Sequence, residues 1–225
     1  YGKPRVAHEI VEKYHEGLIC CSACLAGEVP KALVAGDIEA ARKAIEWHRS
    51  VFGEDYYLEV QLHKTEIPGL SLEVYEGQKI VNEHIFSLAE EMGIKVVATN
   101  DVHFVNREDG PAHDRLICLT TNSMVDDTNR MRYTQQEYLK SEDEMAALFP
   151  GHPEVIANTL EVADKIEVYS IDRDHVLPKF KIDPAFLGNI DYYLDKYKDI
   201  IDASARSLNI EKIARTVGVD DDDEN

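Results

Sequence analysis

The sequence has no long apolar run and few basic residues. No stretch approaches the roughly 20 consecutive apolar residues that a membrane-spanning helix needs, so we expect no contact with a membrane. Its 24 Lys and Arg stand against 43 Asp and Glu, a formal net charge of −19. This balance excludes a stand-alone protein that holds duplex DNA on a basic face, because such binding depends on Lys and Arg. Apolar residues still make up 44% of the chain, which excludes a disordered protein.

Cysteine is also scarce. The four cysteines are Cys20, Cys21, Cys24 and Cys118, and the first three are crowded into one short segment. This crowding argues against a disulfide framework and is typical of a reducing, cytoplasmic setting. The chain begins at Tyr1 without Met or an apolar leader, so we expect it to be part of a longer protein.

The sequence lacks a P-loop, a G-x-S-x-G motif and a Gly-rich dinucleotide loop, which excludes the sites built on those motifs. What is present over residues 17–106 is an alternation of extended and helical segments. We expect strands at 18–21, 56–62 and 95–99, and the longest helices at 37–52 and 72–92. Such alternation predicts an α/β layer or barrel with parallel strands.

The remainder of the chain is rich in helical signals. Pro111 opens one expected helix, a capping box at Ser141 and Glu144 opens a second, and Pro153 opens a third. Residues 190–203 predict one more helix. The chain ends on a run of acidic residues at 220–224, which we expect to be a mobile tail.

The most specific candidate site follows the strand at 95–99. In an extended chain, residues two apart point to the same side, so Asp101 and His103 are expected to aim a carboxylate and an imidazole at one point. They would lie at the carboxyl end of a parallel strand, where α/β proteins place their sites. This pair suits Zn, Mn or Fe. The alternative, which the spacing alone favours, is an Asp that caps a helix and a His bonded to a neighbouring carbonyl.

Cys24 is the second candidate, because it follows the strand at 18–21. A thiolate there would join Asp101 and His103 on a metal ion. The alternative is a small buried apolar residue, the usual role of a free cysteine. Cys21 and Cys24 also have C-x-x-C spacing, but a redox pair would require a helix N-terminus at that place.

Other polar residues have simpler explanations. Glu59 and Gln61 alternate with apolar residues and face either a barrel interior or solvent. His63 lies just beyond them, where it could reach a site, but we expect it on a surface loop. His113 and Asp114 are expected to cap a helix.

The residues named above occur together with several further motifs. The segments that carry a resemblance are 17–29, 98–104, 112–114, 129–132, 138–141, 144–145 and 177–180. In this order and spacing they resemble the later portion of the PHP (polymerase and histidinol phosphatase) domain in the bacterial DNA polymerase III alpha-subunit family. The resemblance covers about residues 1–180.

The resemblance implies a fold and a division into domains. Residues 1–110 would form the C-terminal portion of a distorted seven-stranded β/α barrel. Residues 111–180 would form the helical remainder of the PHP domain, leading toward the polymerase palm. Residues 181–225 would be a helical linker, or the start of the polymerase region, with the acidic tail.

The resemblance also implies a metal site. PHP domains of this family hold up to three metal ions at the carboxyl ends of the barrel strands, and Cys24, Asp101 and His103 match three of the ligands. Zn or Mn is expected in this site, and Mg in a polymerase site outside this chain. The other PHP ligands and the palm carboxylates are expected outside the chain as well, so no catalytic residue is assigned within it.

The function implied is that of a DNA-directed DNA polymerase in chromosomal replication, a nucleotidyltransferase, with this chain inactive by itself. Its PHP domain would be a metal-dependent phosphoesterase resembling a 3′–5′ exonuclease, or the remnant of one. The implied partners are the rest of the alpha subunit, the proofreading exonuclease subunit, the sliding clamp, and DNA through the parent protein. One alternative is a non-catalytic structural or docking module, and a weaker one is a stand-alone PHP phosphoesterase.

Overall fold

The protein contains a small parallel sheet, seen in a computed structural model that describes residues 5–172, 195 and 198. Its strands are β1 (Cys20–Cys21), β2 (Tyr56–Val60) and β3 (Val96–Ala98), in the order β1-β2-β3. Cys20 pairs with Tyr56 and Leu58 pairs with Val96, both in parallel register. The predicted α/β class is therefore confirmed, while the seven-stranded barrel stays a prediction.

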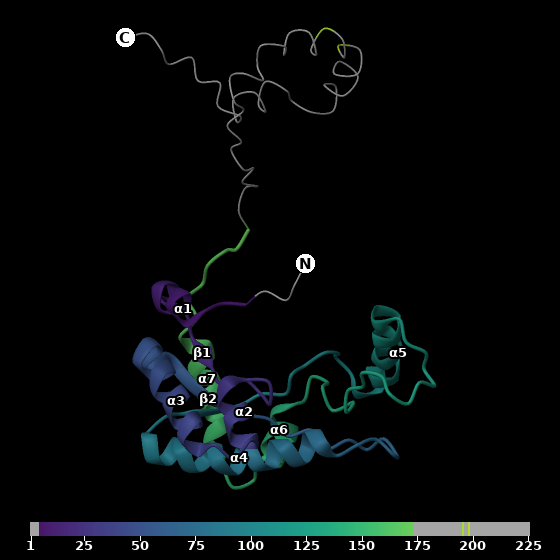
Figure 1. Cartoon of the computed structure of the whole chain (residues 1–225), viewed down its shortest axis with the longest axis horizontal. Helices are drawn as coiled ribbons and strands as arrows, with labels where there is room; N and C mark the ends of the chain where they lie inside the picture. Colours follow the sequence, from purple (N-terminus) through teal and green to yellow (C-terminus); the bar gives the residue numbers. More distant parts are fainter. Residues whose placement is uncertain (1–4, 173–194, 196–197, 199–225) are drawn as a thin grey trace. The chain divides into compact units, whose positions relative to one another are not determined.

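Helices connect and cover these strands (Figure 1). They are α1 (His8–Tyr14), α2 (Glu28–Val34), α3 (Ile38–Phe52), α4 (Glu73–Met92), α5 (Gly110–Thr121), α6 (Glu142–Leu148) and α7 (Glu154–Asp164), with short 3-10 turns at Gly53–Asp55 and Arg107–Asp109. The predicted start signals are confirmed: Asp37 accepts a hydrogen bond from the backbone of Ala40 at 2.9 Å, and Ser141 and Glu144 form a reciprocal capping box.

The core lies between β2 and the helices that flank it. Leu58 and Val60 of β2 are fully buried, as are Ile45 of α3 and Ile85 of α4. The helical spacing of apolar residues in α3 and α4 places these side chains on the faces toward the sheet. β2 is the middle strand and is covered by helices, which explains why nearly all of its residues are buried.

α7 secures the outer edge of β3. Asn158 of α7 donates a hydrogen bond to the backbone carbonyl of Val96 at 2.8 Å, and so satisfies a group on the edge of β3 that no strand of the described residues pairs. Glu161, one turn further on, accepts a hydrogen bond from the Tyr57 hydroxyl at 2.7 Å. Two polar contacts therefore attach α7 to the strands that carry the site.

The chain divides into two units, residues 1–167 and 168–225, and the features described below all lie in the first. The domain boundaries expected at residues 110 and 180 stay predictions. The expected helix at 190–203 and the acidic tail lie outside the described residues.

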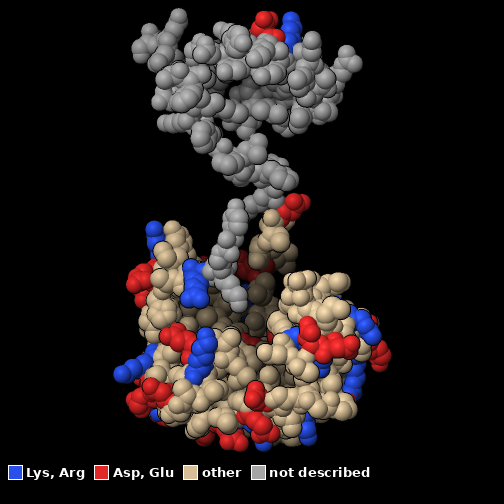
Figure 2. Space-filling view, turned by 45° about the vertical axis from the view of Figure 1, so that its right-hand side comes forward, with Lys and Arg blue, Asp and Glu red and all other residues tan. Residues whose placement is uncertain are grey.

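No helix in the described part of the chain has the length and apolar character to span a bilayer. On the face shown in Figure 2, acidic and basic side chains are interspersed.

His113 and Asp114 do not cap a helix, which corrects the expectation from the sequence. α5 begins at Gly110, before either residue, so both lie inside its second turn. Asp114 instead accepts two hydrogen bonds from the Arg130 guanidinium, at 2.7 and 2.6 Å. This bidentate pair ties α5 to the irregular segment that follows it and holds the pKa of Asp114 below its usual range.

The Arg130–Asp114 pair predicts a pH-dependent stability. Because the folded-state pKa of Asp114 is depressed, its contribution is present above the unfolded pKa, near 4, and is lost as the pH falls through the lower folded pKa. Asp114→Asn is therefore expected to destabilise the chain in urea unfolding at pH 6 and to have a smaller effect at pH 3. The exposed Asp126 serves as the control, with Asp126→Asn neutral at both values. An Asp114→Asn effect of equal size at both pH values would contradict this assignment.

Candidate metal centre

The carboxyl ends of the three parallel strands meet at one edge of the sheet. Cys24 follows β1, His63 follows β2 and Asp101 follows β3, each three residues beyond the strand. These side chains line one cavity of about 300 Å³, together with Gln61, Gln78 and Glu137. The topology thus places Cys24 and Asp101 on a single cavity, as the sequence predicted.

A tight loop presents Cys24. Ala23 adopts a left-handed conformation with φ +60°, which is uncommon for a residue with a side chain. Gly27 donates a backbone hydrogen bond to the Cys24 carbonyl at 2.7 Å, and a Cβ at Gly27 would lie 2.2 Å from the Ser22 carbonyl oxygen. Only glycine fits at position 27 in this loop conformation. The close packing of Gly27 on Ser22 therefore fixes the position of Cys24, which lies between them in the sequence.

The Cys24 thiol is half-buried and is contacted by a helix residue. Gln78 of α4 donates a hydrogen bond to Cys24 Sγ at 3.4 Å. Burial raises the pKa of Cys24, the Gln78 hydrogen bond opposes that effect, and the nearby Asp101 carboxylate adds to it. These effects together favour the protonated thiol.

Asp101 is held in a strained backbone conformation, with φ +46°. Left-handed residues other than glycine concentrate at functional sites, and Asp is among the residues that tolerate the conformation best. His103 Nδ1 lies 4.0 Å from Asp101 Oδ2 and donates a hydrogen bond to the Asp101 carbonyl at 2.6 Å. That bond leaves the lone pair on Nε2, the form in which imidazole binds metals. His103 is beside Asp101 but does not line the cavity, so the predicted trio is brought together only in part.

His63 is buried, and its expected place on a surface loop is wrong. Its exposed fraction is 3%, and its Nε2 atom has no hydrogen-bond partner among the described residues. Glu137 is equally buried, and its Oε2 atom is also unpartnered there. Gln61 Oε1 is a third such atom. Buried polar atoms without partners are rare, so three on one cavity mark a place prepared for polar contacts.

The sequence did not identify two of the polar residues that line this cavity. Gln78 lies on the same helix face as Val81 and Ile85, and a lone amide on an apolar face was a signal that could have identified it. Glu137 lies in an irregular segment without periodicity, so no pattern pointed to it. Only the tertiary structure brings Gln78 and Glu137 to the same cavity.

The donor atoms on this cavity are of the types that bind a divalent cation, but too few of them converge. Thiolate and carboxylate donors suit Zn and Mn, and the unpartnered Glu137 oxygen adds another donor on the same cavity. Among the described residues, however, no group of three or more His, Cys, Asp or Glu side chains converges closely enough to hold a metal ion. Cys24 and Asp101 are therefore candidate ligands that do not close around an ion together with a third such side chain in the described part of the chain.

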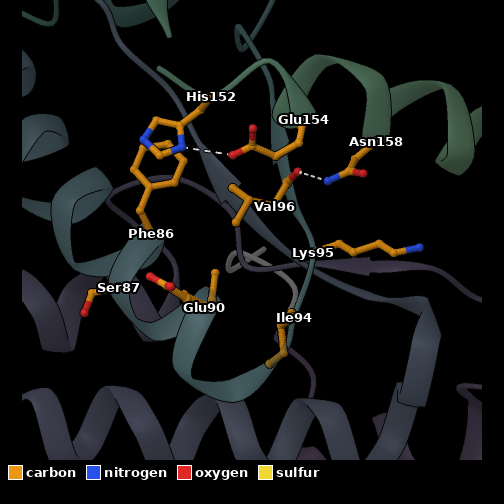
Figure 3. Close-up of a pocket in the computed structure, with 10 residues that line it drawn as sticks. Phe86, Ser87, Glu90, Ile94, Lys95, Val96, His152, Glu154 and Asn158 are labelled. Carbon is orange, nitrogen blue, oxygen red and sulfur yellow. Dashed lines mark hydrogen bonds and ion pairs between the residues drawn. The ribbon is translucent and has the colours of Figure 1, made fainter. Parts of the chain in front are cut away.

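A larger cavity of about 550 Å³ lies at the opposite end of β3, beside Lys95 and Val96 (Figure 3). The His152 ring stacks on Phe86 with centroids 3.6 Å apart, and its Nδ1 is 2.9 Å from a Glu154 carboxylate oxygen. In parallel β/α folds the active sites lie at the carboxyl ends of the strands, whereas this cavity lies at the amino end of β3. We therefore assign it no part in the metal centre.

The sequence is similar to known proteins over most of its length. Residues 1–63 match the PHP domain family. The chain is 38% identical over 197 residues to DNA polymerase III subunit alpha of Borreliella burgdorferi, covering 87% of this chain and 16% of that protein. It is 39% identical over 194 residues to the same subunit of Treponema pallidum, covering 85% of this chain and 16% of that protein. The chain thus spans about a sixth of the length of these relatives. Its sequence is homologous to a PHP-containing segment of the bacterial DNA polymerase III alpha-subunit family.

Proposed function

We propose that this chain is the later part of a PHP domain and supplies ligands to a metal site for phosphodiester hydrolysis. Cys24 and Asp101 would hold a divalent cation, Zn or Mn, and His103 would join them through its free Nε2. A bound cation polarises the phosphoryl group and lowers the pKa of water toward neutrality. It also offsets the repulsion between an acidic protein and a phosphodiester.

One observation carries this proposal. Cys24 and Asp101 come from segments far apart in the sequence, yet they line the same cavity at the carboxyl edge of a parallel sheet. The loop of Cys24 and the backbone of Asp101 both adopt left-handed conformations to present them. Such strain is tolerated where the position of a side chain matters.

The wider setting belongs to the same proposal. The parent would be a DNA-directed DNA polymerase of the cytoplasm, with its Mg-dependent polymerase site elsewhere in the protein. It would work with the proofreading exonuclease subunit and the sliding clamp. By itself the chain would be inactive as a nuclease. Its three candidate ligands would hold one cation at most, and a multi-metal site needs ligands from outside the chain.

The test uses the full-length alpha subunit. Zn or Mn is added to the purified subunit, and release of nucleotides from the 3′ end of labelled DNA is measured. We expect metal-dependent hydrolysis that falls at least 100-fold in Asp101→Asn and in His103→Ala, with the rate of DNA synthesis unchanged as the control. Hydrolysis that is equal in the variants and the wild type would contradict the proposal.

A structural or docking module is the second candidate. It is favoured by the lack of three convergent metal-ligating side chains in the described residues. In that case the full-length subunit would show no metal-dependent hydrolysis. Asp101→Asn would then reduce the stability of the subunit or its association with partners instead.

A further inference from the structure

Gln78 makes three hydrogen bonds from one buried amide group. Its exposed fraction is 2%, and its Oε1 atom accepts a hydrogen bond from the backbone N–H of His63 at 2.7 Å. Its Nε2 atom lies 3.4 Å from Cys24 Sγ and 3.1 Å from His63 Nδ1. Because the backbone N–H requires an acceptor, the orientation of the amide is fixed, and its NH2 group faces the thiol and the imidazole.

This orientation determines where His63 carries its proton. An amide NH2 group donates only, so the 3.1 Å contact requires His63 Nδ1 to accept. The proton of the neutral ring must then lie on Nε2. A nitrogen that carries a proton cannot bind a metal ion, and so His63 lines the cavity without being a ligand.

Glu137 lines the same cavity and carries an acceptor. Glu137 Oε1 accepts hydrogen bonds from the backbone and hydroxyl of Thr134, at 3.1 and 2.7 Å. Its Oε2 atom is unpartnered among the described residues, as is His63 Nε2. Three polar atoms of the residues that line the cavity thus lack a partner in the described part of the chain: the His63 donor and the acceptors of Glu137 and Gln61.

We propose that Gln78 is a positioning residue with two roles. It orients the Cys24 sulfur, and it keeps the proton of His63 on Nε2. His63 then donates a hydrogen bond to an acceptor oxygen atom and does not bind the cation. The part that concerns Cys24 rests on the proposed function. The part that concerns His63 follows from hydrogen bonds within the chain and does not depend on it.

The test is nuclear magnetic resonance on the 225-residue chain with ¹⁵N-labelled histidine. Long-range ¹H–¹⁵N spectra distinguish a protonated ring nitrogen from one with a free lone pair. In the wild type at pH above 7 we expect His63 with its proton on Nε2. In Gln78→Glu, a side chain of the same size, both oxygens are acceptors, so we expect the proton to move to Nδ1. Gln78→Leu removes the donor and is expected to give a mixture of both forms.

Zinc gives the second measurement. On addition of Zn²⁺ we expect the His63 signals to keep their Nε2–H pattern, and Gln78→Leu to weaken zinc binding 10- to 100-fold, as loss of a supporting partner does. A proton on Nδ1 in the wild type, or a His63 signal typical of a metal-bound Nε2, would overturn the proposal. A wild-type chain that binds no zinc would contradict the proposed function, while the proton position would still decide the role of Gln78 toward His63.

Discussion

Ile85→Ala is expected to lower the free energy of unfolding by about 2–5 kcal/mol. Ile85 is fully buried in α4, where it packs in the cluster that joins this helix to β2 and β3. Removing three carbons leaves a cavity, and the surrounding sheet and helices collapse only partly around it. The change is measured by urea unfolding followed by circular dichroism.

The same helix supplies the control. Ile80 belongs to α4 as well but is 47% exposed. Ile80→Ala is expected to change the free energy of unfolding by no more than about 0.5 kcal/mol. Equal effects of the two substitutions would show that α4 does not pack on the sheet as the structure has it.

Cys24→Ala is expected to weaken zinc binding to the 225-residue chain at least tenfold. Cys24 supplies a thiol to the cavity lining, and Zn²⁺ binds thiolate strongly. Even the loss of a residue that only supports a ligand costs about 10- to 100-fold in metal affinity, so the loss of a ligand should cost no less. Affinity is measured by competition with a chromophoric chelator.

Cys20→Ala is the matched control for Cys24→Ala. Cys20 is also a half-buried thiol, but it belongs to β1, packs against the core cluster and does not line the cavity. We expect this substitution to leave zinc affinity unchanged. If both variants lost affinity equally, zinc would be held by the cysteine cluster at large, and the assignment of Cys24 would fail.

Local signals in the sequence predicted most of the elements. Asp37, the Ser141 capping box and the helical spacing in α4 act within a few residues, and the helices begin and end close to where these signals lie. The strand before Thr99 was recognisable because it is apolar on both faces. Parallel topology then placed the residues after each strand at one edge.

The remaining features depend on contacts between distant segments. The sequence could not show that His63 is buried, because burial comes from α4 and the segment around Glu137. Asp114 was mistaken for a cap because its partner, Arg130, lies on a later segment. The side chains of His103 and Asp101 were expected to point to the same side of an extended chain. The left-handed backbone conformation at Asp101 interrupts the two-residue alternation on which that expectation depends.

X-ray absorption at the zinc edge tests the central claim most directly. In the zinc-loaded 225-residue chain we predict one sulfur neighbour at about 2.3 Å and nitrogen or oxygen neighbours at about 2.0–2.2 Å. In Cys24→Ala the sulfur neighbour should be absent, and in Cys20→Ala it should remain. A zinc ion without sulfur in the wild type, or with sulfur retained in Cys24→Ala, would contradict the account.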